Sequence, residues 1–401
     1  MATVDTLRFA TAGSVDDGKS TLVGRLLHDS KSVLADQLEA VRRASRGEGP
    51  DLALLTDGLR AEREQGITID VAYRYFATPR RRFILADTPG HVQYTRNMVT
   101  GASTAELTVV LVDARNGVVE QTRRHAAIAA LLRVPHVVLA VNKMDLVGYQ
   151  EGVFEEIAEE FAKYAIELGV PEVTAVPVSA LAGDNVVEPS ARMDWYGGPT
   201  VLEHLETVPV AAGPADAPAR FPVQYVIRHG ERRYYAGQVA SGVLRVGDRV
   251  TVHPSGETSE IAGIDVLGTP AGAAHASQSV SLRLTDQRDI ARGDLITAGV
   301  DAPTLTQDVR AAVCHLADRP LATGDRVLLR HGTRTVRAVV RDLGGADRLA
   351  VNDLGRIVLR TAEPLPLDDY AVSRRTGAFL LIDPADGATL TAGMVALTAP
   401  V

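Results

Sequence analysis

The 401-residue sequence contains only one cysteine, Cys314, so no disulfide bond can form within the chain. A lone cysteine fits a reducing compartment, where a buried thiol acts as a small apolar residue. The sequence also lacks an apolar run of the roughly 20 residues that a membrane-spanning helix needs, and its first residues lack the pattern of a signal peptide. These absences predict a cytoplasmic protein that does not enter the membrane.

An excess of basic residues is also absent, because 50 acidic residues outnumber 42 basic ones and give a net charge of −8. No global basic field therefore draws the chain to nucleic acid, and no nucleic-acid partner is expected. Lysine is scarce beside abundant arginine, and its four positions are Lys19, Lys31, Lys143 and Lys163. A lysine kept in such a chain indicates a site that needs a compact ammonium group rather than a planar guanidinium.

Strand and helix patterns alternate over residues 1–206, which predicts an α/β domain with a mainly parallel sheet covered on both faces. The segment FEEIAEEFAKYAIEL has a helical period that puts Phe154, Ile157 and Phe161 on one face. The segment YRYFATPRRRF predicts instead two strands joined by a turn near Pro79. Strand patterns are found at 6–12, 71–77, 81–87, 106–114, 136–142 and 173–179.

The second half of the chain has a different organisation. Residues 207–219 are rich in alanine and proline and are interpreted as a linker. Short strand patterns separated by glycine turns then predict two β-barrel domains, at 220–303 and 304–401. The tetrapeptide GDRV occurs at 247–250 and again at 324–327. This repeat indicates either a duplicated barrel or the same turn used twice before a strand.

The stretch GSVDDGKST matches the phosphate-binding pattern G-x-x-x-x-G-K-[ST] and lies between a predicted strand and a predicted helix. Its glycines let backbone N–H groups and the helix N-terminus surround phosphate oxygens. Lys19 is expected to neutralise the β- and γ-phosphates, and Ser20 to offer its hydroxyl to Mg²⁺. The binding residues predicted here are Gly13, Ser14, Val15, Asp16, Asp17, Gly18, Lys19, Ser20 and Thr21.

Three further motifs follow in order, DTPG at 87–90, NKMD at 142–145 and SAL at 179–181, each after a strand pattern. Asp87 is expected to hold Mg²⁺ through water. The carboxylate of Asp145 can accept hydrogen bonds from N1–H and the 2-amino group of guanine, a pair that adenine does not present, so the predicted nucleotide is GTP. The binding residues predicted in these motifs are Asp87, Gly90, Asn142, Lys143, Asp145, Ser179, Ala180 and Leu181.

Two residues are expected to act in hydrolysis together with Lys19. Thr68 can supply a second Mg²⁺ hydroxyl while the γ-phosphate is present, so its segment is expected to release when that phosphate is lost. His91 stands where other GTPases have a water-positioning glutamine, and its imidazole can hydrogen-bond the attacking water. Ordinary core or surface roles are expected for the other histidines, including His125, His136 and His204.

The sequence resembles the GTPase subunit of bacterial ATP sulfurylase, the sulfate adenylyltransferase subunit 1 family. The likeness is carried by GSVDDGKSTLVGRLLHDSK, ADTPGHVQYTRNMVTGAS, TRRHAAI, ASGVLRVGDRV and GAFLLIDPADGATLTAGMV. It implies a small catalytic partner subunit that forms adenosine 5′-phosphosulfate and pyrophosphate from ATP and sulfate, while this chain hydrolyses GTP to drive that step. No second phosphate loop follows, so the adenylylsulfate kinase that some relatives carry is not expected.

The resemblance also implies a monovalent cation beside Asp16. The alternative is that Asp16 and Asp17 only shape the turn through side-chain hydrogen bonds to the backbone. The sequence departs from the family pattern at two places. The first concerns the second switch segment, which follows DTPG, and the second concerns a surface for contact with the partner. Val92 stands where glutamate is usual, and VIRHGERRYYAG is a shortened form of the first hairpin of the second domain.

Two other functions stay open at this point. The chain resembles translation factors in plan, and such a factor in its GTP state would carry aminoacyl-tRNA on its barrels. A structural protein with a degenerate nucleotide site is the second alternative, and the intact nucleotide-binding elements argue against it. Copurification separates sulfate activation from the translation-factor function, because a stoichiometric small protein favours the former and bound tRNA favours the latter.

Overall fold

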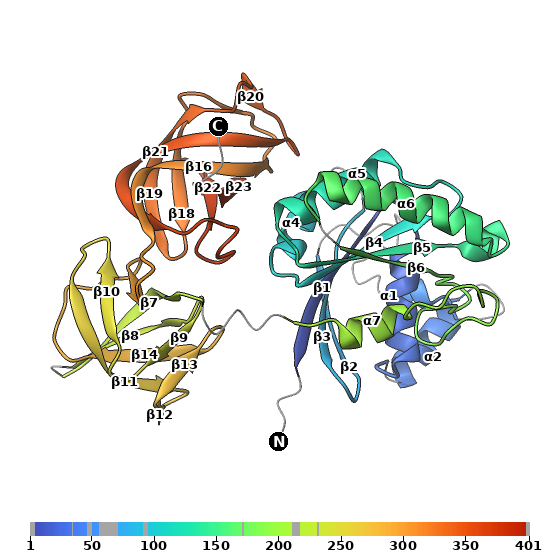
Figure 1. Ribbon diagram of the computed structural model, residues 1–401, viewed down its shortest axis with the longest axis horizontal. Helices are drawn as coiled ribbons and strands as arrows, with labels where there is room; N and C mark the ends of the chain where they lie inside the picture. Colours follow the sequence, from blue (N-terminus) through green and yellow to red (C-terminus); the bar gives the residue numbers. More distant parts are fainter. Residues whose placement is uncertain are drawn as a thin grey trace. The chain divides into compact units, whose positions relative to one another are not determined.

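A computed structural model describes residues 5–33, 35–45, 50–55, 71–90, 95–170, 172–210, 217–230 and 232–397 (Figure 1). The chain divides into two compact units, unit 1 (Met1–Val210) and unit 2 (Ala211–Val401). Within the described ranges, no helix is both long and apolar enough to cross a membrane.

Unit 1 is built on a six-stranded sheet with the order β2-β3-β1-β4-β5-β6. Neighbours from β3 to β6 pair in parallel, as the alternation of strand and helix patterns predicts. β2 is antiparallel to β3, which confirms the predicted hairpin. The strands are β1 (Thr6–Gly13), β2 (Ala72–Ala77), β3 (Arg82–Asp87), β4 (Leu107–Asp113), β5 (His136–Asn142) and β6 (Val173–Pro177). The helices are α1 (Lys19–Asp29), α2 (Ala35–Ala44), η1 (Leu52–Leu55), α4 (Thr95–Ser103), α5 (Glu120–Leu131), η3 (Met144–Val147), α6 (Glu151–Glu167) and α7 (Val201–Thr207).

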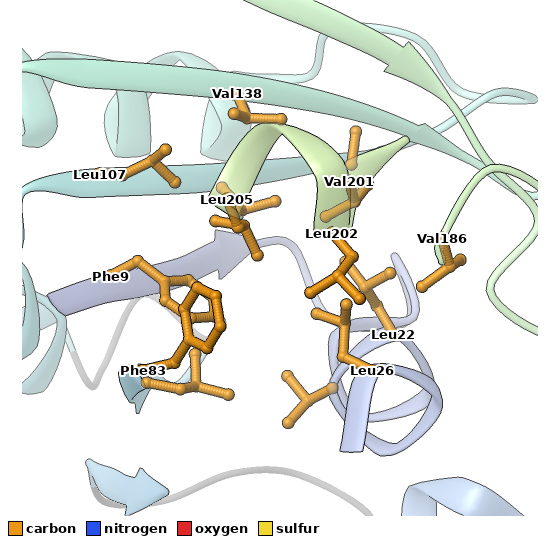
Figure 2. Close-up of a cluster of buried hydrophobic side chains, with 14 of the residues drawn as sticks. Phe9, Leu22, Leu26, Phe83, Leu107, Val138, Val186, Val201, Leu202 and Leu205 are labelled. Atoms are coloured by element: carbon orange, nitrogen blue, oxygen red, sulfur yellow. The ribbon is translucent and has the colours of Figure 1, made fainter. Parts of the chain in front are cut away.

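Both faces of this sheet are buried, because its central strands send alternate side chains into two separate cores. In β4, Leu107 and Val109 belong to one core with side chains of α1 and α7. Val110 and Val112 belong to the other core with side chains of α5 and α6. Figure 2 shows the first core, where Phe9, Phe83 and Val138 of the sheet lie close to the helices. Strands buried on both faces are continuous apolar runs, as in these sequences.

The longest predicted helix of unit 1 is confirmed as α6. Its predicted apolar face is the face it buries, with Ile157, Phe161 and Ala165 almost fully covered. Phe154 and Leu168 are partly buried and pack against the same core. The charged residues between them lie on the exposed side, so the helical period of the sequence and the burial pattern agree.

Unit 2 contains two β-barrels, one on each side of residue 303. In the first, β10 pairs with both β15 and β11, which closes the ring β10-β15-β7-β8-β14-β11. The second is a closed barrel with the order β16-β21-β19-β18-β22-β23. The strands of the first half are β7 (Ala219–His229), β8 (Arg232–Gln238), β9 (Val243–Arg245), β10 (Arg249–His253), β11 (Thr258–Val266), β12 (Thr269–Ala271), β13 (Ala273–His275), β14 (Ser279–Leu284) and β15 (Leu295–Ala298). Those of the second half are β16 (Thr304–His315), β17 (Leu321–Ala322), β18 (Arg326–His331), β19 (Arg334–Asp342), β20 (Arg348–Leu349), β21 (Leu354–Leu367), β22 (Ala378–Ile382) and β23 (Thr389–Val395).

The repeated GDRV sequence forms the same turn in both barrels. Gly247 and Gly324 have φ angles of 91° and 92°, a left-handed conformation that favours glycine. The carboxylate of Asp248 accepts a hydrogen bond from the N–H of Arg245 at 2.7 Å, and that of Asp325 accepts one from Ala322 at 3.0 Å. The repeat is therefore explained by local turn chemistry before β10 and β18.

A buried ion pair joins the two barrels of unit 2. Arg220 of β7 and Asp368, which follows β21, are 2% and 8% exposed. The Arg220 guanidinium donates to both carboxylate oxygens of Asp368 at 3.0 Å. Thr376 donates its hydroxyl to the same carboxylate at 2.6 Å. A buried carboxylate with three such donors is stable only while its cationic partner is present.

We expect Arg220→Ala to lower the free energy of unfolding by about 3–5 kcal/mol, because it leaves the Asp368 carboxylate buried without its cation. Urea unfolding of the whole chain followed by circular dichroism measures this loss. The matched control is Arg360→Ala, since Arg360 and Asp308 form an exposed pair at 2.7 Å and such pairs contribute about 1 kcal/mol or less. Equal effects of the two substitutions would contradict the role given to Arg220.

Candidate nucleotide-binding site

The predicted nucleotide-binding motifs lie where strands of unit 1 end. β1 ends at Gly13, β3 at Asp87 and β5 at Asn142, and β6 ends two residues before Ser179. The carboxyl ends of parallel strands share one edge of a sheet, which is where open α/β sheets bind ligands. The order of the strands therefore gathers motifs that are far apart in the sequence.

The phosphate-binding loop is held in shape by two left-handed residues and one buried side chain. Asp16 and Gly18 have φ angles of 69° and 91°. The carboxylate of Asp17 is buried and accepts a hydrogen bond from the N–H of Ser14 at 2.5 Å. Burial raises the pKa of Asp17, and that hydrogen bond opposes the rise. Asp17 therefore has the turn-shaping contact considered in the sequence analysis, whereas the side chain of Asp16 is exposed.

The Lys19 ammonium lies inside this loop, and the residue as a whole is 8% exposed. It donates to the carbonyl oxygens of Gly13 at 2.9 Å and Ser14 at 3.2 Å. Burial lowers the pKa of Lys19, and the negative charges of Asp87, Asp17 and Asp16 oppose that effect. An ammonium has three N–H donors, so this one keeps a donor for an anion in the loop.

Asp87 and Gly90 bring the second motif against the first. Asp87 is 1% exposed and accepts a hydrogen bond from the Thr11 hydroxyl at 2.9 Å. A Cβ atom on Gly90 would lie 2.3 Å from Lys19 Nζ and 2.4 Å from the Gly13 carbonyl oxygen. Only glycine allows the DTPG segment to approach the loop this closely.

The side chain of Asn142 connects the phosphate loop with the SAL segment. Its Nδ2 donates to the carbonyl oxygen of Asp17 at 2.7 Å. Its Oδ1 accepts a hydrogen bond from the N–H of Ala180 at 2.9 Å. Asn142 is buried, and a Cβ atom on Gly18 would lie 2.4 Å from its Nδ2. One amide group therefore fixes the distance between the two binding segments.

A hydrogen bond joins Asp145 of the NKMD motif to Ser179 of the SAL motif. The Ser179 hydroxyl donates to Asp145 Oδ1 at 2.6 Å. Ser179 is fully buried, while Asp145 is half-buried. The hydrogen bond orients the carboxylate and leaves the second oxygen available to a base.

Lys143 makes a contact that the sequence did not predict, with Asp113, the last residue of β4. Lys143 Nζ lies 3.0 Å from Asp113 Oδ2 and also donates to the Asp16 carbonyl oxygen. Arg115 donates to both oxygens of the same carboxylate. Burial would raise the pKa of Asp113, but the hydrogen bonds from Arg115 and Lys143 lower it well below its usual range. Lys143 therefore links the phosphate loop to the Asp113 carboxylate, which stays ionised.

Gln121 and His125 on α5 reach the same site, and neither was predicted there. Gln121 Nε2 donates to the Gly90 carbonyl oxygen at 3.2 Å and lies 3.0 Å from His125 Nε2. Burial, together with the positive charges of Lys19 and Arg124, lowers the pKa of His125 to about 3. His125 is therefore neutral and accepts the amide hydrogen, in keeping with a buried structural histidine.

The structure thus brings together the loop 13–21, Asp87, Gly90, Asn142, Lys143, Asp145 and the SAL segment. Two predicted catalytic residues, Thr68 and His91, and also Val92 lie outside the described residues. Within the described ranges, no group of three or more His, Cys, Asp or Glu side chains could hold a metal. The assignment of Ser20 and the buried Asp87 as Mg²⁺ ligands stays a prediction from the sequence.

Comparisons with known proteins identify the families and relatives that the chain resembles. Residues 5–210 match the elongation factor Tu GTP-binding domain family, and residues 308–396 match the eEF1A C-terminal domain-like family. The chain is 48% identical to sulfate adenylyltransferase subunit 1 of Cellvibrio japonicus, over 97% of this chain and 86% of that protein. It is 47% identical to the subunit of the same name from Yersinia enterocolitica, over 97% of this chain and 85% of that protein. It is 54% identical to the bifunctional enzyme CysN/CysC of Mycobacterium tuberculosis, over 97% of this chain but about two thirds of that enzyme.

We expect Gly90→Ala to weaken binding of a nonhydrolysable GTP analogue by roughly 5- to 150-fold, because forcing an atom into a packed contact costs about 1–3 kcal/mol. Isothermal titration calorimetry measures the affinity. Gly152→Ala is the matched control, since a Cβ atom there has no neighbour within 4 Å. Unchanged binding by the folded Gly90→Ala protein would show that the two motifs do not meet in the binding state.

Proposed function

This chain belongs to the sulfate adenylyltransferase subunit 1 family of GTPases, and from that premise we propose that its GTP hydrolysis drives sulfate activation by a separate catalytic subunit. In the proposed step a sulfate oxygen attacks the α-phosphorus of ATP on the partner. The bond to the β-phosphate breaks, and adenosine 5′-phosphosulfate and pyrophosphate form. The observation that carries the proposal is that the likeness to subunit 1 spans 97% of this chain, both barrels included.

We assign the phosphate end of the site to the loop 13–21, with Lys19 as the residue that neutralises charge on the β- and γ-phosphates. Its support is the position of the ammonium, which donates to loop carbonyls and keeps a free donor. Ser20 and Thr68 would hold Mg²⁺ directly and Asp87 through water, and the bound ion would offset charge on the phosphates. The monovalent cation beside Asp16 remains a proposal from the family likeness alone.

We assign the base end to Asp145, Asn142 and the SAL segment. The Asp145 carboxylate, oriented by Ser179, is a suitable acceptor for N1–H and the 2-amino group of guanine. His91 is proposed to position the attacking water, and its imidazole can take the role that glutamine has in other GTPases. The assignments of His91 and Thr68 rest on their places in the sequence.

We further propose that the partner is the small catalytic subunit of the same enzyme, because the relatives that match are named as one subunit of it. The buried lone thiol of Cys314 fits a reducing compartment such as the cytoplasm. The families that match residues 5–210 and 308–396 are both named after elongation factors. A translation-type role in carrying aminoacyl-tRNA is therefore the alternative outcome of the test.

We expect that this chain, mixed with its small subunit, ATP and sulfate, raises the yield of adenosine 5′-phosphosulfate when GTP is added. The reason is that hydrolysis free energy reaches the partner only if the two active sites are coupled. A nonhydrolysable GTP analogue and the variant His91→Ala should bind but not sustain the yield, and Lys163→Ala, an exposed substitution on α6, should behave as the unaltered chain does. Chromatographic measurement of the product at equilibrium checks this.

The same yield with and without GTP hydrolysis would contradict the proposed coupling. Stoichiometric tRNA on the purified chain, with no binding of the small subunit, would favour the translation-type function instead.

A further inference from the structure

Arg25 of α1 holds the backbone of the SAL segment. Its Nε donates to the carbonyl oxygen of Ala180 at 3.2 Å, and its Nη2 donates to the carbonyl oxygen of Leu181. Asp29, one turn further along α1, lies 3.8 Å from Arg25 Nη1. The Arg25 side chain is 21% exposed, and of its two contacts the one to Ala180 is partly buried and the one to Leu181 is exposed. A guanidinium can bind two adjacent carbonyls at once because its donors form a fixed planar fork.

These contacts determine where the N–H group of Leu181 points. In a trans peptide the C=O of one residue and the N–H of the next lie in one plane and point in opposite directions. Because the carbonyl of Ala180 faces Arg25, the N–H of Leu181 faces away from Arg25. Within the part of the chain that the structure describes, this N–H has no hydrogen-bond partner.

The side opposite Arg25 is the base-reading side of the segment. The carbonyl of Leu181 also faces Arg25, and the N–H of Ala182 on the far side of that peptide donates to the Ser179 hydroxyl at 3.3 Å. The same hydroxyl donates to Asp145. The free N–H of Leu181 is therefore directed toward the side on which Asp145 is held.

We propose that Arg25 is a positioning residue for guanine recognition, which fixes the peptide between Ala180 and Leu181 so that the Leu181 N–H meets O6 of the base. Guanine has an acceptor at this position, whereas adenine has an amino group that donates. The fixed N–H thus favours guanine and disfavours adenine. This inference rests on the assignment of the base site made above.

The position of Arg25 also explains how one helix serves both ends of the nucleotide. α1 begins at Lys19, in the phosphate loop, and reaches the SAL segment less than two turns later. His28 lies on the same helix and its Nδ1 is 2.6 Å from Asp29 Oδ1. Asp29 therefore contacts both Arg25 and His28, so the Arg25 guanidinium has a partner on its own helix as well as on the SAL segment.

The test compares a guanine nucleotide with a ligand that has phosphates only. We expect Arg25→Ala to weaken GDP binding about tenfold or more, the size of a lost pair of charge-assisted hydrogen bonds. Binding of inorganic tripolyphosphate should stay within about twofold, because its contacts end at the phosphate loop. Arg25→Lys should fall between, since one ammonium cannot reproduce the planar fork. Titration calorimetry with Mg²⁺ present measures both affinities.

The matched control is Arg43→Ala. Arg43 also pairs with an acidic residue one helical turn away, Glu39 at 3.4 Å, but both side chains are exposed. This control should leave both affinities unchanged. The thermal midpoint of each variant shows whether it is folded, and Arg25→Lys serves if Arg25→Ala is not.

Unchanged GDP affinity in folded Arg25 variants would overturn the proposal, as would an equal loss for GDP and tripolyphosphate, which would make Arg25 a general support of the fold. Failure of the base-site assignment looks different: the unaltered chain would then bind GDP no better than ADP. If the unaltered chain prefers GDP and the variants keep that preference, only the role of Arg25 is wrong.

Discussion

The side-chain amide of Asn142 is the contact on which the binding site depends. Its two ends bond to backbone groups of two segments, the phosphate loop at Asp17 and the SAL segment at Ala180. An amide that is both donor and acceptor can do this, whereas an aspartate would present only acceptors to the Asp17 carbonyl. Because Asn142 ends a strand buried on both faces, it cannot shift without disturbing two cores. The spacing between the phosphate loop and the SAL segment is thus set by the sheet.

The two lysine ammonium groups of the site are kept in position by backbone carbonyls and by nearby buried carboxylates. Lys19 and Lys143 both donate to carbonyl oxygens of the phosphate loop, and Asp87 and Asp113 lie near them as buried anions. The acidic residues of the loop have separate roles. Asp17 caps the turn with its carboxylate, while Asp16 contributes its carbonyl to Lys143. A loop that binds an anion can therefore contain carboxylates, because the negative charges of Asp16 and Asp17 are offset by the nearby positive charge of Lys19.

The sequence was sufficient for features that depend on local chemistry or on pattern period. The strands of unit 1, the β2–β3 hairpin, the buried face of α6 and the two barrels all follow from apolar spacing and turns. Contacts between distant residues were missed, as shown by Arg25, Gln121 and the pair Arg220–Asp368. Arginine is common in this sequence, and nothing in the local sequence of these residues indicates a partner that is far away along the chain. Asp113 had a usable signal, since it ends a strand pattern at the carboxyl edge of the sheet. Thr68 and His91 lie outside the described residues and stay predictions.

The most direct test of the account is the base preference of Asp145→Asn. The substituted side chain keeps an oxygen for the Ser179 hydroxyl, so the network around it can persist, but its other atom becomes a donor. A donor there repels N1–H and the amino group of guanine and suits the carbonyl of xanthine. The account predicts that GTP affinity falls by several kcal/mol, about 2–4, and that xanthosine triphosphate becomes the preferred nucleotide in competition titrations. Unchanged GTP affinity, with no gain for xanthosine triphosphate, would show that this site does not read guanine.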